Sequence, residues 1–368
     1  MKFKTNFYGW LIVLCLLSCS RKERLITADV IEFDSFAKEF TKISHPTGVS
    51  VMGVLGISSF ENIMVAITTN PEALISIIDL DTERTLFTGM TRGRGPDEFL
   101  MLITNCQFVN RNEHPCLWVC DAGVRKCVLI DLTETVEKQA IVSSESWQYE
   151  KVYEQRSGML ILSSGERFVK FPVTYKDVRD DIRYYPKYLY FTDDNVVREL
   201  PFFRRGSFLL SESNYENAST GAFDGVTILK PDGTKAIDAF YFADHLNFLD
   251  LIENRGFSMH YSKGMSVDDL VSATFSYLRQ HHVNAYMTAV VTDDYVFALY
   301  SGKQDPMPGE TAPDVASSIR IFDWEGTPSA LVHVDKELRS IAYDQRTKRL
   351  YALDFEENIM YYDFSDVI

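Results

Sequence analysis

An aspartate between two large apolar residues recurs at the ends of apolar runs in this chain. The pattern has four copies: Ile78-Asp79-Leu80, Ile130-Asp131-Leu132, Phe322-Asp323-Trp324 and Tyr362-Asp363-Phe364. The first two copies lie 52 residues apart and the last two lie 40 apart. The apolar neighbours suit a strand packed in a stack of sheets, and the aspartate suits a cap on the turn to the next strand. The pattern therefore predicts a repeated unit of strands and turns.

Tight-turn residues divide the chain between these aspartates into hairpins. Asp121-Ala122-Gly123, Pro231-Asp232-Gly233 and Glu325-Gly326-Thr327 each separate two apolar runs, as hairpin turns do. A period of about 40–50 residues with four strands is typical of a β-propeller, and the aromatic content of 13% favours strands. We therefore expect an all-β fold with a six-bladed β-propeller over residues 46–368, closed by an N-terminal strand that pairs into the last blade.

One segment departs from the strand pattern. Ser266 is suited to cap a helix, with Asp269 three residues later. The apolar residues that follow have helical spacing: Val267, Leu270, Val271, Thr274 and Leu278. The sequence thus predicts a small helical insertion within residues 254–282, packed on the edge of a blade. A lid over a ligand, or a helix that docks a partner, is the alternative.

The first residues have the form of a bacterial export signal. Two lysines precede an apolar run over residues 7–17, which is too short to span a bilayer. Leu16-Leu17-Ser18-Cys19 then resembles a lipobox, in which the cysteine is acylated and becomes the new N-terminus. This predicts a lipoprotein signal peptide over residues 1–18. Residues 19–45 are then a lipidated tether with the strand that enters the propeller.

The tether favours an anchor that faces the periplasm. Glu23 is the only acidic residue between Cys19 and Arg24. An acidic tether would indicate display on the cell surface, and this location remains the alternative. The expected location is the cell envelope, with the outer membrane as the partner of the lipid. The net charge of −15 argues against nucleic-acid binding and against a polybasic membrane patch.

The cysteines beyond the signal allow two interpretations. They are Cys106, Cys116, Cys120 and Cys127, and their spacing matches no common zinc site. An exported protein can form disulfides, whereas small buried thiols are ordinary in a core of strands. The sequence leaves open which interpretation applies.

A glycine-rich turn follows the first aspartate pattern, with the sequence Thr91-Arg92-Gly93-Arg94-Gly95-Pro96-Asp97-Glu98-Phe99. Gly93 and Gly95 permit positive φ, and Pro96 fixes its own φ. We expect a turn between blades in which Glu98 accepts backbone N–H groups and Phe99 fills a gap. The alternative is an anion site, whose candidate ligand-binding residues are Arg92, Arg94, Asp97 and Glu98.

This motif resembles one in the TolB-like, six-bladed propeller lipoproteins of Bacteroidetes-type bacteria, which are relatives of the NHL-repeat propellers. Two further segments are similar to that family: Phe322-Asp323-Trp324-Glu325-Gly326-Thr327-Pro328 and Arg349-Leu350-Tyr351-Ala352-Leu353. The resemblance covers most of residues 45–368. It implies a lipid-anchored propeller and no particular reaction.

Motifs for catalysis are few, and no catalytic residue or metal ligand can be named. HExxH and Gly-x-Ser-x-Gly are absent, and adjacent His281 and His282 would point about 100° apart on a helix. Asp193-Asp194 and Asp293-Asp294 are typical of hairpin turns, with Ca²⁺ ligation at a blade mouth as the alternative. Three aromatic residues suit either packing between blades or stacking on sugar rings: Trp147, Tyr184 and Tyr185.

These observations support two main hypotheses for the function. The first is a non-enzymatic binding or scaffold module, without a cofactor, for a protein, peptide or glycan. The second is a Ca²⁺-dependent hydrolase of the lactonase type, which needs three or more Asp, Asn or Glu side chains converging on one point. A subunit of an envelope transport or sensing assembly is a third possibility.

Overall fold

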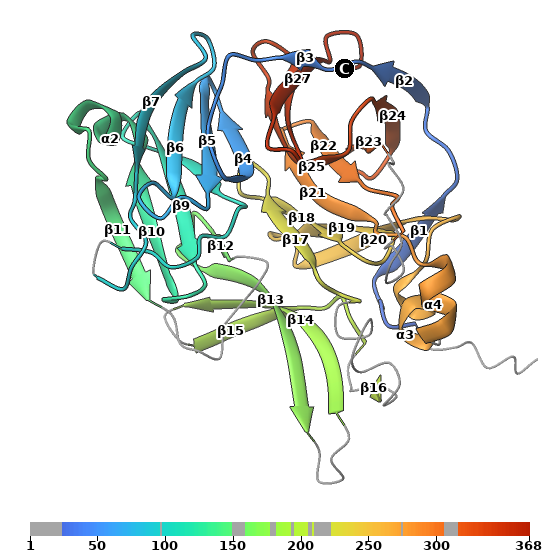
Figure 1. The fold of residues 1–368 in the computed structure, drawn as a ribbon. Coiled ribbons are helices and arrows are strands. Elements are labelled where there is room, and N and C mark those ends of the chain that lie inside the picture. Colours follow the sequence, from blue (N-terminus) through green and yellow to red (C-terminus); the bar gives the residue numbers. More distant parts are fainter. Residues whose placement is uncertain are drawn as a thin grey trace, which may run out of the picture.

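The computed structural model describes residues 24–95, 98–148, 159–176, 182–192, 195–204, 208–209, 222–273, 275–304 and 316–368. In these residues six separate sheets stand around a common axis, and each sheet is one blade (Figure 1). Strands make up 53% of the described residues, in which there are three short helices. The predicted six-bladed β-propeller is therefore confirmed.

The first three blades follow one another along the chain. Blade 1 contains β4 (Val54–Phe60), β5 (Ile63–Thr68), β6 (Ile75–Asp79) and β7 (Arg84–Gly89). Blade 2 contains β8 (Gln107–Arg111), β9 (His114–Asp121), β10 (Lys126–Asp131) and β11 (Ser143–Gln148). Blade 3 contains β12 (Leu160–Ile161), β13 (Arg167–Lys176), β14 (Ile182–Thr192) and β15 (Asn195–Leu200), and β16 (Phe208–Leu209) pairs with β14.

The last three blades each take one strand from the N-terminal segment. Blade 4 contains β17 (Gly225–Leu229), β18 (Lys235–Phe240), β19 (His245–Asp250), β20 (Arg255–Tyr261) and β1 (Asp29–Phe33). Blade 5 contains β21 (Tyr286–Val291), β22 (Tyr295–Tyr300), β23 (Ser318–Asp323), β24 (Pro328–Val334) and β2 (Lys38–Lys42). Blade 6 contains β25 (Leu338–Asp344), β26 (Arg349–Asp354), β27 (Ile359–Asp363) and β3 (His45–Pro46).

The N-terminal segment runs along the outside of the ring and contacts four blades in turn. Ile26 forms a bridge to Phe203, just after blade 3. β1 and β2 then add parallel to β20 and β24, and β3 pairs antiparallel with β27. The pairing of β3 confirms the predicted closure of the last blade. The two parallel additions cover the outer edges of blades 4 and 5, which would otherwise be open to other strands.

The ring has two ends, which we name by what lies there. The link end carries the turns between second and third strands and the links from each blade to the next. The mouth end carries the turns between first and second strands and between third and fourth strands. In Figure 1 the long β13–β14 hairpin and the helices α3 (Val267–Ser272) and α4 (Phe275–His281) mark the link end, at the bottom of the view.

The recurring aspartates end strands, as the sequence predicted, and the structure shows that these are the third strands of their blades. The Asp79 side chain accepts hydrogen bonds from the backbone N and the Oγ1 of Thr82, and Asp323 accepts from two backbone N–H groups of its turn. Asp131 differs from the prediction, because it caps α2 (Leu132–Lys138) rather than a direct turn to the next strand. A further copy, Leu249-Asp250-Leu251, ends β19 in blade 4 and was missed.

The helical insertion between blades 4 and 5 is shorter and more broken than predicted. Residues 255–261 form β20, so the insertion begins after Tyr261 and not at residue 254. Ser266 caps α3 by accepting from Asp269 N, as expected. Ala273 then takes an extended conformation, so the expected single helix is two. Leu278 of α4 and Leu270 of α3 nevertheless pack into one core, as the apolar spacing predicted.

Apolar side chains fill the seams between neighbouring blades rather than one central core. In the seam between blades 6 and 1, Tyr351 and Leu353 pack against Met64 and Ile78. Fully burying one such side chain contributes about 1.5–3 kcal/mol. Because the hydrophobic stabilisation is spread around the ring in this way, the axis of the ring is left for a channel.

Candidate functional site

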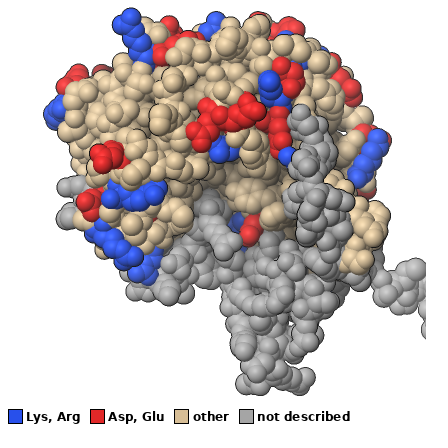
Figure 2. All heavy atoms as spheres, in the orientation of Figure 1, with Lys and Arg blue, Asp and Glu red and all other residues tan. Residues whose placement is uncertain are grey.

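A cavity of about 430 Å³ lies on the axis of the ring and is lined by residues of all six first strands. Its lining includes Leu162 and Ser163, and also residues 230–233. Both segments belong to turns of the mouth end, so the cavity extends to that end. Figure 2 shows a hollow near the middle of the displayed face, with a basic and an acidic side chain visible inside it. The volume is within the range of small-molecule sites.

Neutral polar groups and aromatic rings share the lining of this cavity. The hydroxyl and amide side chains are Ser58, Ser59, Asn105, Gln107, Asn110, Ser163, Thr227 and Thr288. Phe60 and Phe108 stack with ring centroids 5.5 Å apart. The charged lining residues are Arg111, Lys230 and Asp232, of which Lys230 donates a hydrogen bond to Asp232. Such a lining suits a polar ligand with little net charge.

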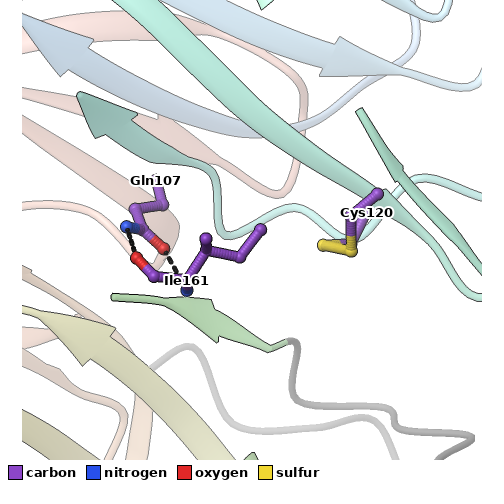
Figure 3. The surroundings of a disulfide bond; sticks show 4 residues. Gln107, Cys120 and Ile161 are labelled. Atoms are coloured by element: carbon purple, nitrogen blue, oxygen red, sulfur yellow. Dashed lines mark hydrogen bonds between the residues drawn. A yellow bond between two sulfur atoms is a disulfide. The ribbon is translucent and has the colours of Figure 1, made fainter. Parts of the chain in front are cut away.

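Two first strands have backbone groups that form hydrogen bonds with a side chain of a neighbouring blade. Gln107 Nε2 donates to Ile161 O at 2.6 Å, and Ile161 N donates to Gln107 Oε1 at 2.9 Å (Figure 3). Ser340 Oγ accepts from Ile57 N at 3.1 Å and lies 3.3 Å from Ile57 O. These contacts satisfy backbone groups that have no further strand beside them. They also hold the wall of the channel in place.

A disulfide joins Cys120 of β9 to Cys127 of β10, which are direct cross-strand partners. Cys120 lines the cavity, close to Gln107 and Ile161 in Figure 3. The disulfide interpretation therefore applies to this pair, and the buried-thiol interpretation applies to Cys116. Cys106 is a free, half-buried thiol in the cavity lining, and burial raises its pKa to about 12. This thiol is therefore protonated at neutral pH and a weak nucleophile.

A buried polar network joins blade 3 to blade 4. Lys170 Nζ lies 2.8 Å from Asp238 Oδ1, and Tyr188 Oη donates to Asp238 Oδ2 at 2.6 Å. Burial raises the pKa of Asp238, and the charge of Lys170 opposes that rise. Two buried charges depend strongly on each other, because neither has water to solvate it. No sequence signal pointed to this pair, whose members lie 68 residues apart.

Two stacked histidines lie on the same blade. The rings of His245 and His260 have centroids 4.7 Å apart and are tilted by 25°, and His245 Nδ1 lies 2.8 Å from Ser258 Oγ. Burial, together with the neighbouring His260, holds the pKa of His245 well below its usual range. His245 is therefore neutral in the folded protein. Because nearly parallel rings direct their nitrogen lone pairs along parallel planes, the pair does not converge on one metal ion.

A second charged cluster lies between blades 4 and 5. Arg320 Nη1 lies 2.7 Å from Asp244 Oδ1 and donates to Tyr286 Oη at 3.1 Å. The Arg320 guanidinium also lies 3.5 Å from the ring centroid of Tyr300, within cation–π range. Of these residues only Asp244 belongs to blade 4, so its ion pair with Arg320 and its hydrogen bond from Tyr286 tie the two blades together.

The glycine-rich turn of the link end has the contacts that a structural turn requires. Glu98 Oε2 accepts from Gly95 N at 2.7 Å, and Phe99 is buried under Lys126 Nζ, which lies 3.8 Å from its ring centroid. Arg92 donates to a carbonyl of a neighbouring turn, and the side chain of Arg94 is exposed. Asp97 lies outside the described residues. Ligand binding by these four candidates stays a prediction.

One group of potential metal ligands occurs in the described part of the chain, at the mouth end of blade 2. It contains His114, Asp131 and Glu134. His114 Nδ1 lies 2.8 Å from Asp131 Oδ2, and this hydrogen bond raises the pKa of His114. Asp131 Oδ1 caps α2 by accepting from Glu134 N. The group is thus a helix cap with a histidine partner, and none of its members lines the cavity.

The remaining sequence candidates have separate positions. Trp147 packs between blades 2 and 3, with the Arg167 guanidinium 3.9 Å from its ring centroid, as the packing interpretation predicted. Asp293 and Asp294 lie in the turn between β21 and β22, which confirms that hairpin. Cys19, Asp193 and Asp194 lie outside the described residues. Tyr184 and Tyr185 lie in β14, but their side chains are not among those described.

No helix in the described ranges is long and apolar enough to cross a membrane.

No family model and no curated protein matches the chain. A presumed exported protein of Bacteroides fragilis NCTC 9343 superposes with a TM-score of 0.51 at 12% identity, covering 91% of this chain and 98% of its own. A DUF4221 family member from Bacteroides vulgatus ATCC 8482 superposes with a TM-score of 0.54 at 10% identity, covering 87% and 95%. At these identities the likeness establishes the propeller fold alone.

Proposed function

We propose that this chain is a lipid-anchored propeller of the cell envelope, of the TolB-like or NHL-like kind, that binds a ligand without converting it. The anchor is Cys19, in an outer membrane and facing the periplasm. The ligand is a protein segment, a peptide or a glycan that enters the axial cavity from the mouth end. The observation that carries this proposal is the cavity itself, lined by neutral hydrogen-bonding groups beside aromatic rings.

The ionisable groups of the lining favour binding over catalysis. Lys230 and Asp232 neutralise each other through a direct hydrogen bond, and the Cys106 thiol is protonated because burial raises its pKa to about 12. General acid–base or nucleophilic catalysis needs a group that can exchange a proton, or attack as an anion, near neutral pH and within reach of a substrate. In the described lining, the polar atoms are instead suited to hold a ligand through hydrogen bonds.

A ligand screen, repeated on a variant whose cavity mouth is filled, tests this function. The purified full chain in detergent micelles is mixed with chito- and malto-oligosaccharides and, separately, with a library of short peptides, and its melting temperature is recorded. A ligand at about 100 times its dissociation constant stabilises the fold by about 2.7 kcal/mol. We expect at least one probe class to raise the melting temperature.

The variant Asn110→Trp fills the mouth, because Asn110 lines the cavity at the exposed end of β8. We expect it to abolish the shift. Thr85→Trp, on the exposed face of the outer strand β7, adds the same side chain away from the cavity and is the control. A shift that survives in Asn110→Trp, or no shift with either probe class, contradicts binding in the channel.

A further inference from the structure

We propose that the link end of the ring is the surface that lies against an anionic lipid bilayer. This inference rests on the lipid anchor of the proposed function and adds which face the anchor presents. Three observations point to the same end: where the chain enters the fold, how far the tether can reach from there, and where apolar side chains are exposed.

The chain is fixed to the link end from Leu25 onward. Leu25 N donates to Asp268 Oδ1 of α3 at 3.0 Å, and Leu25 O accepts from Arg204 N at 2.8 Å. Thr27 N donates to Phe202 O at 2.9 Å, and the side chains of Leu25 and Ile26 are buried. Both partner segments, α3 and residues 202–204, follow fourth strands and so belong to the link end.

The tether before this point is short. Six residue steps separate Cys19 from Leu25, and an extended chain covers at most about 3.6 Å per residue. A lipid on Cys19 therefore holds Leu25 within about 20 Å of the membrane surface. The part of the link end around Leu25 thus stays close to the bilayer in every orientation that the tether allows.

Among the described residues of the link end, five large apolar side chains are exposed. They are Met52, Leu55, Met101, Tyr277 and Phe355. Met52 is the most exposed, at 83%, and its neighbour Gly53 donates to Glu357 of the turn that also carries Phe355. These positions span blades 6, 1 and 2, with Tyr277 across the ring on α4. Exposed apolar groups of this kind are stabilised in the headgroup region of a bilayer.

Exposed charges of both signs occur at both ends of the ring. Among the described residues, the exposed basic ones of the link end are Arg24, Arg92, Arg94, Arg204, Lys263 and Lys336. Exposed acids there are also present, among them Glu72, Asp335 and Glu356, so this end is mixed. The described mouth-end turns carry exposed acids in blades 1, 2, 4 and 5, namely Glu61, Asp81, Glu113, Glu253, Asp293, Asp294 and Glu325. Exposed basic residues lie in or beside the same turns: Arg84, Arg111, Lys138, Arg255, Arg346 and Lys348.

Each basic residue near an anionic surface contributes about 1 kcal/mol of attraction. The exposed arginines of the glycine-rich turn, Arg92 and Arg94, then face lipid phosphates. The mouth of the cavity faces away from the bilayer, toward the aqueous compartment.

Fluorescence quenching by brominated lipid tests the orientation. The full chain is reconstituted into vesicles of equal parts phosphatidylcholine and phosphatidylglycerol with brominated acyl chains. Tyr277→Trp places a reporter on the link end, and Ile252→Trp places one on an exposed position of the mouth end. We expect the added fluorescence to be quenched in Tyr277→Trp and unchanged in Ile252→Trp. Equal quenching in both variants, or quenching of Ile252→Trp alone, overturns the proposal.

A second experiment separates this proposal from the anchor. Cys19→Ser chains cannot be acylated, and their binding to the same vesicles at low salt depends on the protein surface alone. Arg92→Glu/Arg94→Glu is expected to weaken that binding by roughly 10- to 30-fold. Lys138→Glu/Lys348→Glu changes the charge equally at the mouth end and is expected to leave binding unchanged. Equal effects of the two double variants overturn the proposal, whereas failure of the unmodified chain to float with vesicles refutes only the anchor.

Discussion

Replacing Lys170 by methionine tests whether the seam between blades 3 and 4 depends on a matched pair of charges. Lys170 is 5% exposed and Asp238 is 0% exposed. Methionine keeps most of the apolar stem and removes the ammonium group, so Asp238 retains the hydrogen bond from Tyr188 but loses its counter-charge. Breaking a buried pair in this way typically costs about 3–5 kcal/mol. We expect Lys170→Met to lower the free energy of unfolding by that amount.

Equilibrium unfolding in urea measures this loss. Lys138→Met is the matched control, because it makes the same chemical change in an ion pair with Glu134 whose lysine is 59% exposed; little change is expected there, since surface pairs contribute little. Adding Asp238→Asn to Lys170→Met removes both charges and is expected to recover most of the stability. The reasoning is refuted if Lys170→Met is as mild as Lys138→Met, or if the double variant loses the sum of the two single losses.

Three further predictions concern stability. Burial lowers the pKa of His245 in the folded protein, so as pH drops below about 6.5 the unfolded chain takes up a proton there and the free energy of unfolding falls. Urea midpoints measured from pH 7.5 to 5.5 check this. The measurement uses a His114→Gln background, because the upward-shifted pKa of His114 would add a pH dependence of its own. Cys120→Ser/Cys127→Ser removes the disulfide that closes a short loop and is expected to lower the free energy of unfolding by about 2.5 kcal/mol. The urea midpoint of this variant should be lower than that of the unmodified chain, and dithiothreitol should not change it further. Gly225→Ala places a Cβ against a backbone carbonyl of the paired strand and is expected to lower the melting temperature by several degrees, unlike Thr85→Ala on an outer strand.

The candidate site was only partly predictable. Asn110, Thr227 and Thr288 line the cavity, but a first strand of a propeller has no residue pattern that distinguishes it from the other strands of its blade. The period of the turns gave the number of blades and so implied an axis. Which side chains border the axis depends on how each blade is rotated about it, and that is decided by packing between blades.

Features that depend on neighbours in sequence could be predicted from the sequence by itself. Asp79 and Asp323 cap their turns through backbone N–H groups two to four residues away, and Ser266 caps a helix through Asp269 N. Such contacts form wherever the local residues allow them, because closing a short loop costs little entropy. The aspartates, the turns and their spacing thus determined a propeller with six blades.

Features that join distant segments were decided only by the tertiary structure. The partner of Lys170 is 68 residues away, and the disulfide needed the register that places Cys120 opposite Cys127. The net charge of −15 argued against a basic membrane-facing patch, yet Arg92 and Arg94 are exposed together at the link end. The net charge of a sequence does not say where the charged residues lie. The direction of each strand in the fold decides at which end of the ring its turns lie, and with them their charged side chains.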